Sequence, residues 1–221
     1  MTQALRLYDY WRSAAAYRVR IGLNLKGLAY EQVAVNILPG ADEQFQAAFR
    51  SLNPQARVPV LQTPAGEIDQ SLAILEWLDE TYPAPSLLPG DPWARAQARA
   101  FALTIAADIH PLGNLSVLKQ LREQFSASEA DLGVWRERWF GGGMAALEQR
   151  LAGRPATPFV FGDTPSLADI CLVPQIYGAR RFGLDLSAFP RLVDRAAAAE
   201  AHPAFAAAAP ERQPDSVRPP S

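Results

Sequence analysis

Cysteine and histidine are both scarce in this sequence. The single cysteine, Cys171, excludes an internal disulfide and a cysteine-rich metal site. The two histidines, His110 and His202, lie far apart and form neither an HxxxH nor an HExxH pattern, which argues against a zinc site. We therefore predict a reduced protein without a metal ion.

A strong excess of one charge and long apolar runs are also missing. The 21 basic and 23 acidic residues give a net charge of -2, whereas nucleic-acid binding would require a basic excess. No apolar run approaches the roughly 20 residues of a membrane span, and the first residues carry no signal-peptide pattern. We expect a cytoplasmic protein without nucleic-acid or membrane partners.

Short apolar runs alternate with helical stretches over the first 80 or so residues, which predicts an α/β domain with a mixed sheet. We predict strands over Leu5–Tyr10, Glu31–Ile37 and Val58–Gln62, a hairpin turn at Pro64–Gly66 leading into a further strand, a helix capped by Ser13 and ended before Gly27, and helices over Glu43–Leu52 and Ser71–Tyr82.

The remainder reads as helical. A Pro- and Gly-rich stretch precedes it and is the best linker candidate. We predict an α/β domain over residues 1–83, a linker at 84–92, an all-helical domain over 93–210 and a loose polar tail at 211–221. Three glycines, Gly141–Gly143, lie inside a predicted helix at a cost of about 1 kcal/mol each. They indicate either a bend or a close backbone approach.

Four short patterns could carry chemistry or could be structural. Val58–Pro59 is a candidate cis peptide that could expose backbone for pairing with an extended ligand. Ser71 opens an apolar helix, where free N–H groups bind carboxylates, although simple capping explains it too. Ser13, beside Arg12 and Arg18, offers the same two interpretations.

The fourth pattern, Ser166–Asp169, is a capping box ahead of an apolar run. We interpret Asp169 as a folding determinant and the nearby Cys171 as an inert core thiol.

Together these patterns resemble the cytosolic glutathione transferases, and among them the zeta class, which includes maleylacetoacetate isomerases. The similarity runs from about residue 5 to about residue 214 and rests on the stretches YDYWRS, RVRIGLNLKG, LNPQARVPVL, IDQSLAILEWLDETYP, LLPGDP, IHPLGNLSVLKQL, GDTPSLADICLVPQ, ARRFGLDL and RQPD. It implies a thioredoxin-like N-terminal domain, an all-helical C-terminal domain and a homodimer.

The class motif Ser-Ser-Cys-x-x-Arg is changed in this chain, which has SAAAYR at residues 13–18. The resemblance implies that glutathione supplies the thiol that adds to a cis double bond, allows rotation to trans, and is eliminated. The chain then needs no nucleophile of its own, so activity is compatible with Ala14 and Ala15. A hydroxyl at a helix start, from Ser13, would favour the thiolate.

The resemblance also assigns residues. Ser13 and Arg18 would be catalytic, and Arg12 and Arg181 would bind substrate carboxylates, which suits the planar guanidinium. Glutathione would be held by Gln44, Val58, Pro59, Gln70, Ser71, His110, Asn114 and Ser116, although the family has glutamine in the place of His110.

The predicted function is conversion of maleylacetoacetate to fumarylacetoacetate in tyrosine or aromatic catabolism. Three alternatives stay open: a maleylpyruvate isomerase, a general glutathione transferase or α-haloacid dehalogenase, and a non-catalytic glutathione-binding relative.

Overall fold

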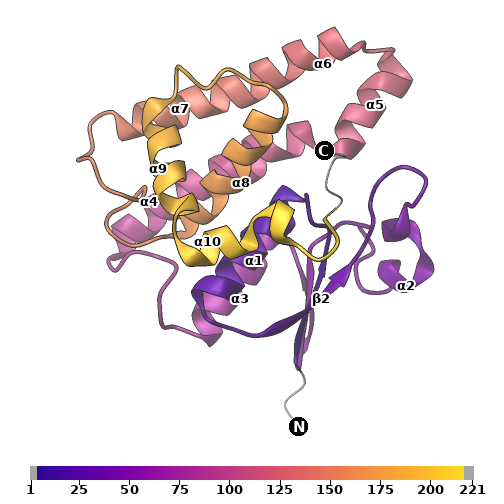
Figure 1. Ribbon diagram of the computed structural model, residues 1–221, viewed down its shortest axis with the longest axis horizontal. Helices are drawn as coiled ribbons and strands as arrows, with labels where there is room; N and C mark the ends of the chain where they lie inside the picture. The colour runs from indigo at the N-terminus through magenta and orange to yellow at the C-terminus, as the bar shows by residue number, and fades with distance from the viewer. Residues whose placement is uncertain (1–3, 217–221) are drawn as a thin grey trace. The chain divides into compact units, whose positions relative to one another are not determined.

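Apolar alternation near the start of the chain produces an inner strand of a four-stranded sheet (Figure 1). In β1 (Leu5–Asp9), positions 5, 7 and 9 are buried. The other strands are β2 (Tyr30–Ala34), β3 (Val60–Thr63) and β4 (Gly66–Asp69), in the order β2-β1-β3-β4. Since β1 and β2 are parallel and the other two pairs antiparallel, the predicted mixed sheet is confirmed.

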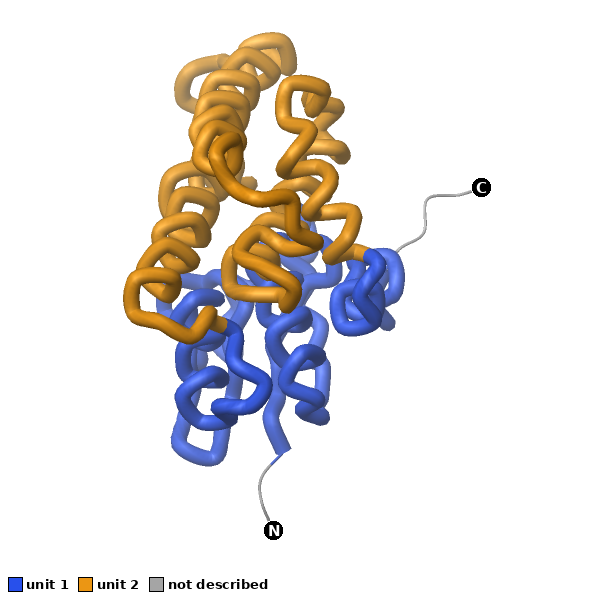
Figure 2. Tube along the Cα trace, turned by 90° about the vertical axis from the view of Figure 1, so that its left-hand side faces the viewer, with its two compact units in different colours: residues 1–87, 201–221 blue, residues 88–200 orange. Residues whose placement is uncertain are grey.

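The structure, a computed structural model, describes residues 4–216. Its internal contacts divide the chain into two compact units, which Figure 2 colours separately. Unit 1 holds the described residues up to Leu87 and those from Ala201 onward, and unit 2 is Leu88–Glu200. The change of unit at Leu87 falls inside the predicted linker.

Helical elements lie between and after the strands of unit 1 and confirm the predicted β-α-β-α-β-β-α order: α1 (Ala14–Leu25), the 3-10 turn η1 (Glu43–Phe45), α2 (Ala47–Arg50) and α3 (Ser71–Thr81). Unit 1 also holds α10 (Pro203–Ala208) and the 3-10 turn η5 (Pro210–Arg212), which the sequence prediction did not place in this domain. α1 packs against both α3 and α10. Gly22 allows the first contact, because a Cβ there would lie 2.2 Å from the Leu75 side chain.

Unit 2 is helical throughout apart from loops. Its elements are α4 (Pro92–Leu103), η2 (Thr104–Ile109), η3 (His110–Gly113), α5 (Leu115–Phe125), α6 (Glu129–Arg136), η4 (Glu137–Gly141), α7 (Gly142–Leu151), α8 (Leu167–Arg181) and α9 (Pro190–Glu200). α8 is the core of the unit: it is buried along most of its length and packs against α4 and α9. Its apolar composition therefore reflects burial on several sides.

The tail differs from the sequence prediction. Residues 201–216 belong to unit 1, whereas the sequence placed residues up to 210 in the helical domain and made 211–221 a loose tail. Gln213 is buried, and its Nε2 donates to Ala207 O at 3.1 Å and to Ala209 O at 2.7 Å. These bonds correct the prediction for residues 211–216; residues 217–221 lie outside the described part.

One helical stretch, residues 92–125, is long and apolar enough to cross a membrane by length and composition alone. It is not one regular α-helix, because the π-helical η2 and the 3-10 turn η3 separate α4 from α5. Buried core helices pass the same test, so a single such stretch is weak evidence. The predicted absence of a membrane partner stays a prediction.

The capping box at the start of α8 is confirmed. Asp169 accepts hydrogen bonds from Val160 N at 2.8 Å and from Ser166 N and Oγ, both at 2.9 Å. Cys171 is buried in the same helix as a free thiol. Among residues 4–216, no group of three or more histidine, cysteine or acidic residues is placed to hold a metal ion.

Two structural features bear on the three glycines, namely an irregular turn of helix and a close contact of the helix backbone. It coincides with the π-helical η4 and the first turn of α7, within one continuous helical stretch. A Cβ on Gly143 would lie 2.3 Å from the buried Ile109 side chain, whereas one on Gly142 would meet nothing within 4 Å. Close approach therefore explains Gly143 and does not explain Gly142.

We predict opposite effects for alanine at these two positions. Gly143→Ala should lower the free energy of unfolding by about 1–3 kcal/mol, because the buried Ile109 side chain would have to shift within the core. Gly142→Ala, the matched control, should raise it by up to about 1 kcal/mol through helix propensity. Urea unfolding of both variants measures the difference, and equal effects at the two positions would contradict the close approach.

Asp169 predicts a pH-dependent stability. Burial raises the pKa of its carboxyl from 3.8 to about 6. The folded state thus binds the proton more tightly than the unfolded chain, so this contribution is complete below the unfolded pKa and is lost as pH rises through about 6. Between pH ~4 and ~7, the wild type should lose about 2 kcal/mol of stability relative to Asp169→Asn. Urea unfolding across this range tests it; a stability difference independent of pH would refute it.

Candidate active site

The register of the sheet brings several chain segments to one of its edges. Asp9, the last residue of β1, pairs with Ala34, the last of β2. Val60, the first residue of β3, pairs with Tyr8 and with Asp69, the last residue of β4. The loops that follow β1, β2 and β4, and the loop that precedes β3, therefore all meet this edge. Arg12, Ser13, Val58, Pro59 and Gln70 lie in these loops, whereas Gln44 lies in η1, Ser71 begins α3 and Arg18 lies inside α1.

Ser13 is the N-cap of α1, as predicted. Its Oγ accepts a hydrogen bond from Ala16 N at 3.3 Å, and its own N–H donates to Tyr10 O at 2.8 Å. A hydroxyl that accepts through its oxygen can still donate its hydrogen. Ser13 therefore offers a donor at the positive end of a twelve-residue helix that has no acidic residue in its first turn.

The start of α3 is a second place suited to an anion. Gln70 precedes the helix with φ 63°, a left-handed conformation that is uncommon for a residue other than glycine and that often occurs at functional sites. No side chain among the described residues caps this helix. Its first amide N–H groups can therefore donate to a bound carboxylate. Ser71, the first helical residue, is buried beside them.

Arg18 reaches the start of α3 from inside the fold. Its side chain is 2% exposed, and Nη1 donates to Ser71 Oγ at 3.3 Å. The guanidinium thus adds positive charge behind the hydroxyl. Arg18 could therefore influence a bound ligand through its hydrogen bond to Ser71. Its predicted catalytic role stays a prediction.

The loop before β3 carries a cis peptide bond between Val58 and Pro59, so the candidate suggested by the sequence is confirmed. Val58 precedes the strand, which leaves its N–H and C=O outside the sheet ladder. Asn53 holds this loop by donating from Nδ2 to Arg57 O at 2.8 Å. An exposed backbone edge of this kind can pair with an extended peptide.

Gln44 and Arg12 present polar atoms that are buried but unsatisfied within the described residues. Gln44 is 7% exposed, and its Oε1 has no hydrogen-bond partner among residues 4–216. The Arg12 guanidinium lies 5.0 Å from the centre of the Trp11 ring, and its Nε likewise lacks a partner in that part of the chain. Buried groups of this type are normally hydrogen-bonded, so both are ready to bind a ligand.

Three predicted residues of unit 2, His110, Asn114 and Ser116, lie in the break between α4 and α5 and at the start of α5. His110 begins η3, and Asn114 is the N-cap of α5. Asn114 Oδ1 accepts from Ser116 N at 3.1 Å and from Ser116 Oγ at 3.0 Å. This pair is therefore accounted for as a helix cap, and only the Asn114 amide NH2 remains as a donor.

Arg181 ends α8 and is exposed, with its guanidinium 4.5 Å from the centre of the Phe182 ring. Arg136, which the sequence analysis missed, stands at the same distance from that ring. Burial lowers the pKa of Arg136 below its usual value. Neither spacing nor periodicity links two arginines from different helices, so no sequence signal pointed to Arg136.

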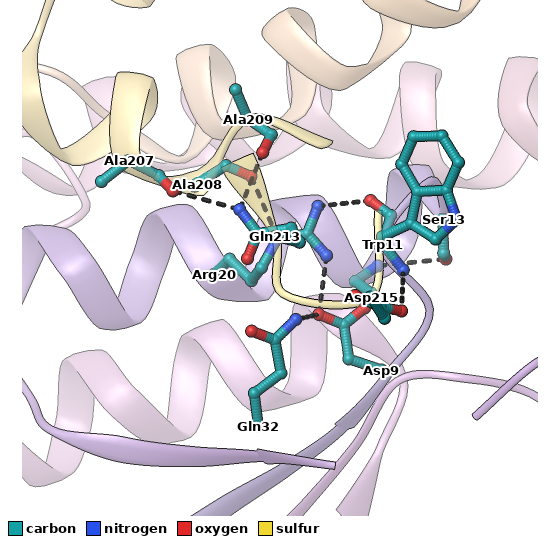
Figure 3. A network of polar contacts seen from close by, with 11 residues as sticks. Asp9, Trp11, Ser13, Arg20, Gln32, Ala207, Ala208, Ala209, Gln213 and Asp215 are labelled. Atoms are coloured by element: carbon teal, nitrogen blue, oxygen red, sulfur yellow. Dashed lines mark hydrogen bonds and ion pairs between the residues drawn. The ribbon is translucent and has the colours of Figure 1, made fainter. Parts of the chain in front are cut away.

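A buried polar network behind Ser13 was also missed (Figure 3). Asp9 and Arg20 form an ion pair with Nη1 2.6 Å from Oδ2, and neither side chain is exposed. Burial raises the pKa of the Asp9 carboxyl, while Arg20 opposes that effect. The sequence did contain one signal for this network: Asp9 and Arg20 are charged residues at positions that the strand and helix patterns predict to be buried.

Two family models and several known proteins match this chain. Residues 7–86 match the family model described as glutathione S-transferase, N-terminal domain, and residues 91–207 match its C-terminal domain. Maleylacetoacetate isomerase of Pseudomonas aeruginosa is 49% identical over 212 residues, which cover 96% of this chain and 98% of that protein.

Two solved structures are also similar to this chain over nearly its full length. A holo structure of maleyl pyruvate isomerase, a bacterial zeta-class glutathione S-transferase, is 46% identical with a TM-score of 0.93 and covers 96% of this chain and 100% of its own. Maleylacetoacetate isomerase from Anaeromyxobacter dehalogenans 2CP-1, solved with dicarboxyethyl glutathione and citrate in its active site, is 47% identical with a TM-score of 0.86 and covers 99% and 100%.

Proposed function

Because this chain belongs to the glutathione S-transferase family, we propose that it is a glutathione-dependent cis–trans isomerase that converts maleylacetoacetate to fumarylacetoacetate. The predicted combination of a thioredoxin-like domain and an all-helical domain is the fold of that family. The observation that carries the proposal is the near full-length similarity to maleylacetoacetate isomerases, at 49% identity in one relative.

The residues of unit 1 fit glutathione. The uncapped start of α3 suits a carboxylate, and the buried Arg18 behind Ser71 strengthens its positive potential. The unsatisfied Gln44 Oε1 suits an N–H donor, and the backbone of Val58 suits an extended peptide. Together these groups match a short peptide with a free amino-acid end.

When bound, glutathione supplies the thiol whose addition to the double bond and later elimination permit rotation from cis to trans. The Ser13 hydroxyl would donate its hydrogen to the sulfur and, with the positive end of α1, would lower the pKa of the thiol. Ala14 and Ala15 are half-buried and supply only apolar surface at the next two positions. The chain thus contributes hydrogen-bond donors and shape, and no nucleophile.

The substrate is a small acid, and Arg12 and Arg181 are proposed to bind its carboxylates. Each guanidinium lies against an aromatic ring, which holds the planar fork in place. His110, Asn114 and Ser116 are proposed as further glutathione contacts. For Asn114 that contact would be made by its amide NH2, since its oxygen already accepts two hydrogen bonds.

Maleylpyruvate is the second candidate substrate, favoured by the TM-score of 0.93 to a maleyl pyruvate isomerase. The dicarboxyethyl glutathione in the Anaeromyxobacter relative supports either acid, because it has the composition of a thiol added to a four-carbon diacid. We further propose a cytoplasmic homodimer that takes part in aromatic catabolism.

Turnover of both maleyl acids, with and without glutathione, tests this function. We expect isomerisation that requires glutathione and a higher kcat/KM for maleylacetoacetate. Preference for maleylpyruvate would select the second candidate. Faster turnover of dichloroacetate would indicate a transferase or dehalogenase, and glutathione binding without any turnover would indicate a non-catalytic relative; either result would overturn the isomerase.

Ser13→Ala should lower kcat by about 100-fold or more, the usual effect of removing one donor to a developing negative charge. The KM for glutathione should change by less than about threefold, because the start of α3 is untouched. Ser13→Thr, which keeps both the hydroxyl and the cap, is the control and should retain most of the activity. An unchanged rate in Ser13→Ala would mean that another donor activates the sulfur.

A further inference from the structure

The loop between β1 and α1 is fixed at both polar groups of one peptide residue, Trp11. Its N–H donates to Asp215 Oδ2 at 3.1 Å, and its C=O accepts from Arg20 Nη2 at 2.8 Å. Figure 3 shows the two contacts on the short path from the end of β1 to Ser13. The loop therefore depends on one residue of helix α1 and one residue near the end of the described chain.

Arg20 links this loop to the C-terminal segment. Besides Trp11 O and the Asp9 carboxylate, its guanidinium donates from Nε to Ala208 O at 3.0 Å. The side chain is fully buried, so each of these bonds forms away from competing water. Arg20 thus fixes the distance between the end of α10 and the loop that carries Ser13.

Hydrogen bonds in and around the segment after α10 place Asp215 next to Trp11. Gln213 donates to two carbonyls of the preceding turn, Ala207 O and Ala209 O, and Asn24 of α1 donates to Ala204 O at 3.0 Å. Asp215 follows Gln213 by two residues and arrives at Trp11. The RQPD stretch at residues 212–215 therefore connects the C-terminal segment of unit 1 to the loop before α1.

We propose that Asp215 is a positioning residue for the Ser13 hydroxyl, an inference that rests on the proposed use of glutathione. A hydrogen bond to a carboxylate is stronger than one to a neutral acceptor, so Asp215 holds Trp11 firmly. The Ser13 N–H in turn donates to Tyr10 O, which makes residues 10–13 one turn. Moving Trp11 would therefore move Ser13, whose hydroxyl is proposed to donate to the sulfur of glutathione.

Asp215→Ala tests this proposal in the full-length protein. The pKa of bound glutathione, read from the ultraviolet absorbance of the thiolate, should rise by about one unit when one well-placed hydrogen bond is lost. kcat should fall by about 10- to 100-fold through misplacement of the donor. The Kd for glutathione, measured at a pH where the bound thiol is protonated in both proteins, should change by less than about twofold, because the α3 contacts remain.

Two further substitutions separate positioning from a general loss of structure. Asp215→Asn keeps an acceptor for Trp11 N–H and should retain kcat and the thiol pKa within about threefold and about 0.5 unit, respectively. Ser216→Ala is the control next in sequence; its Oγ donates to Glu211 O at 3.3 Å, and it should match the wild type in both readouts. A thiol pKa that is unshifted in a folded Asp215→Ala would overturn the proposal, as would an equal shift in Ser216→Ala.

If Asp215→Ala fails to fold, Asp215→Glu carries the test, because it keeps the charge but moves the carboxylate by one methylene group. An unshifted thiol pKa in this variant would also overturn the proposal. The thiol titration needs glutathione alone. A failure of Asp215 as a positioning residue is therefore distinguishable from an error in the proposed isomerase substrate.

Discussion

The buried ion pair between Asp9 and Arg20 is the interaction on which the geometry of the site in unit 1 depends. Removing two charges from water is costly, and further hydrogen bonds offset part of that cost, although Asp9 Oδ1 has no hydrogen-bond partner among residues 4–216. Gln32 donates to the Asp9 carboxylate at 2.8 Å, and the Arg20 guanidinium reaches two backbone carbonyls. The pair thereby joins β1, the following loop and the C-terminal segment into one polar core.

In the proposed site, unit 1 would bind glutathione mainly through backbone groups. The starts of α1 and α3 lie at the same edge of the sheet, and each presents amide N–H groups and a serine. A helix start attracts a negative charge whatever its side chains, provided that no acidic residue blocks it. This explains how the chain can lack the second serine and the cysteine of the class motif and keep the features that favour a thiolate.

Much of this arrangement followed from local sequence. Ser13 as an N-cap, Gly27 after the helix end, the capping box at Ser166 and the order of strands and helices in unit 1 were predicted and are confirmed. Local patterns succeed at such points because caps and turns are decided within a few residues. The contacts expected from His110 and Arg181 come from family resemblance, and they stay predictions.

The sequence by itself determined which segments form strands and helices and where a helix start could bind an anion, since those features depend on spacing and on cap residues. Only the tertiary structure decided the partners of Asp9, Trp11 and Arg20, because these contacts join residues far apart in the chain. The polar, proline-rich composition after Pro210 predicted a loose tail. Within residues 211–216 the chain is instead held in place by Gln213, which bonds to the preceding turn, and by Asp215, whose partner Trp11 no local pattern reveals.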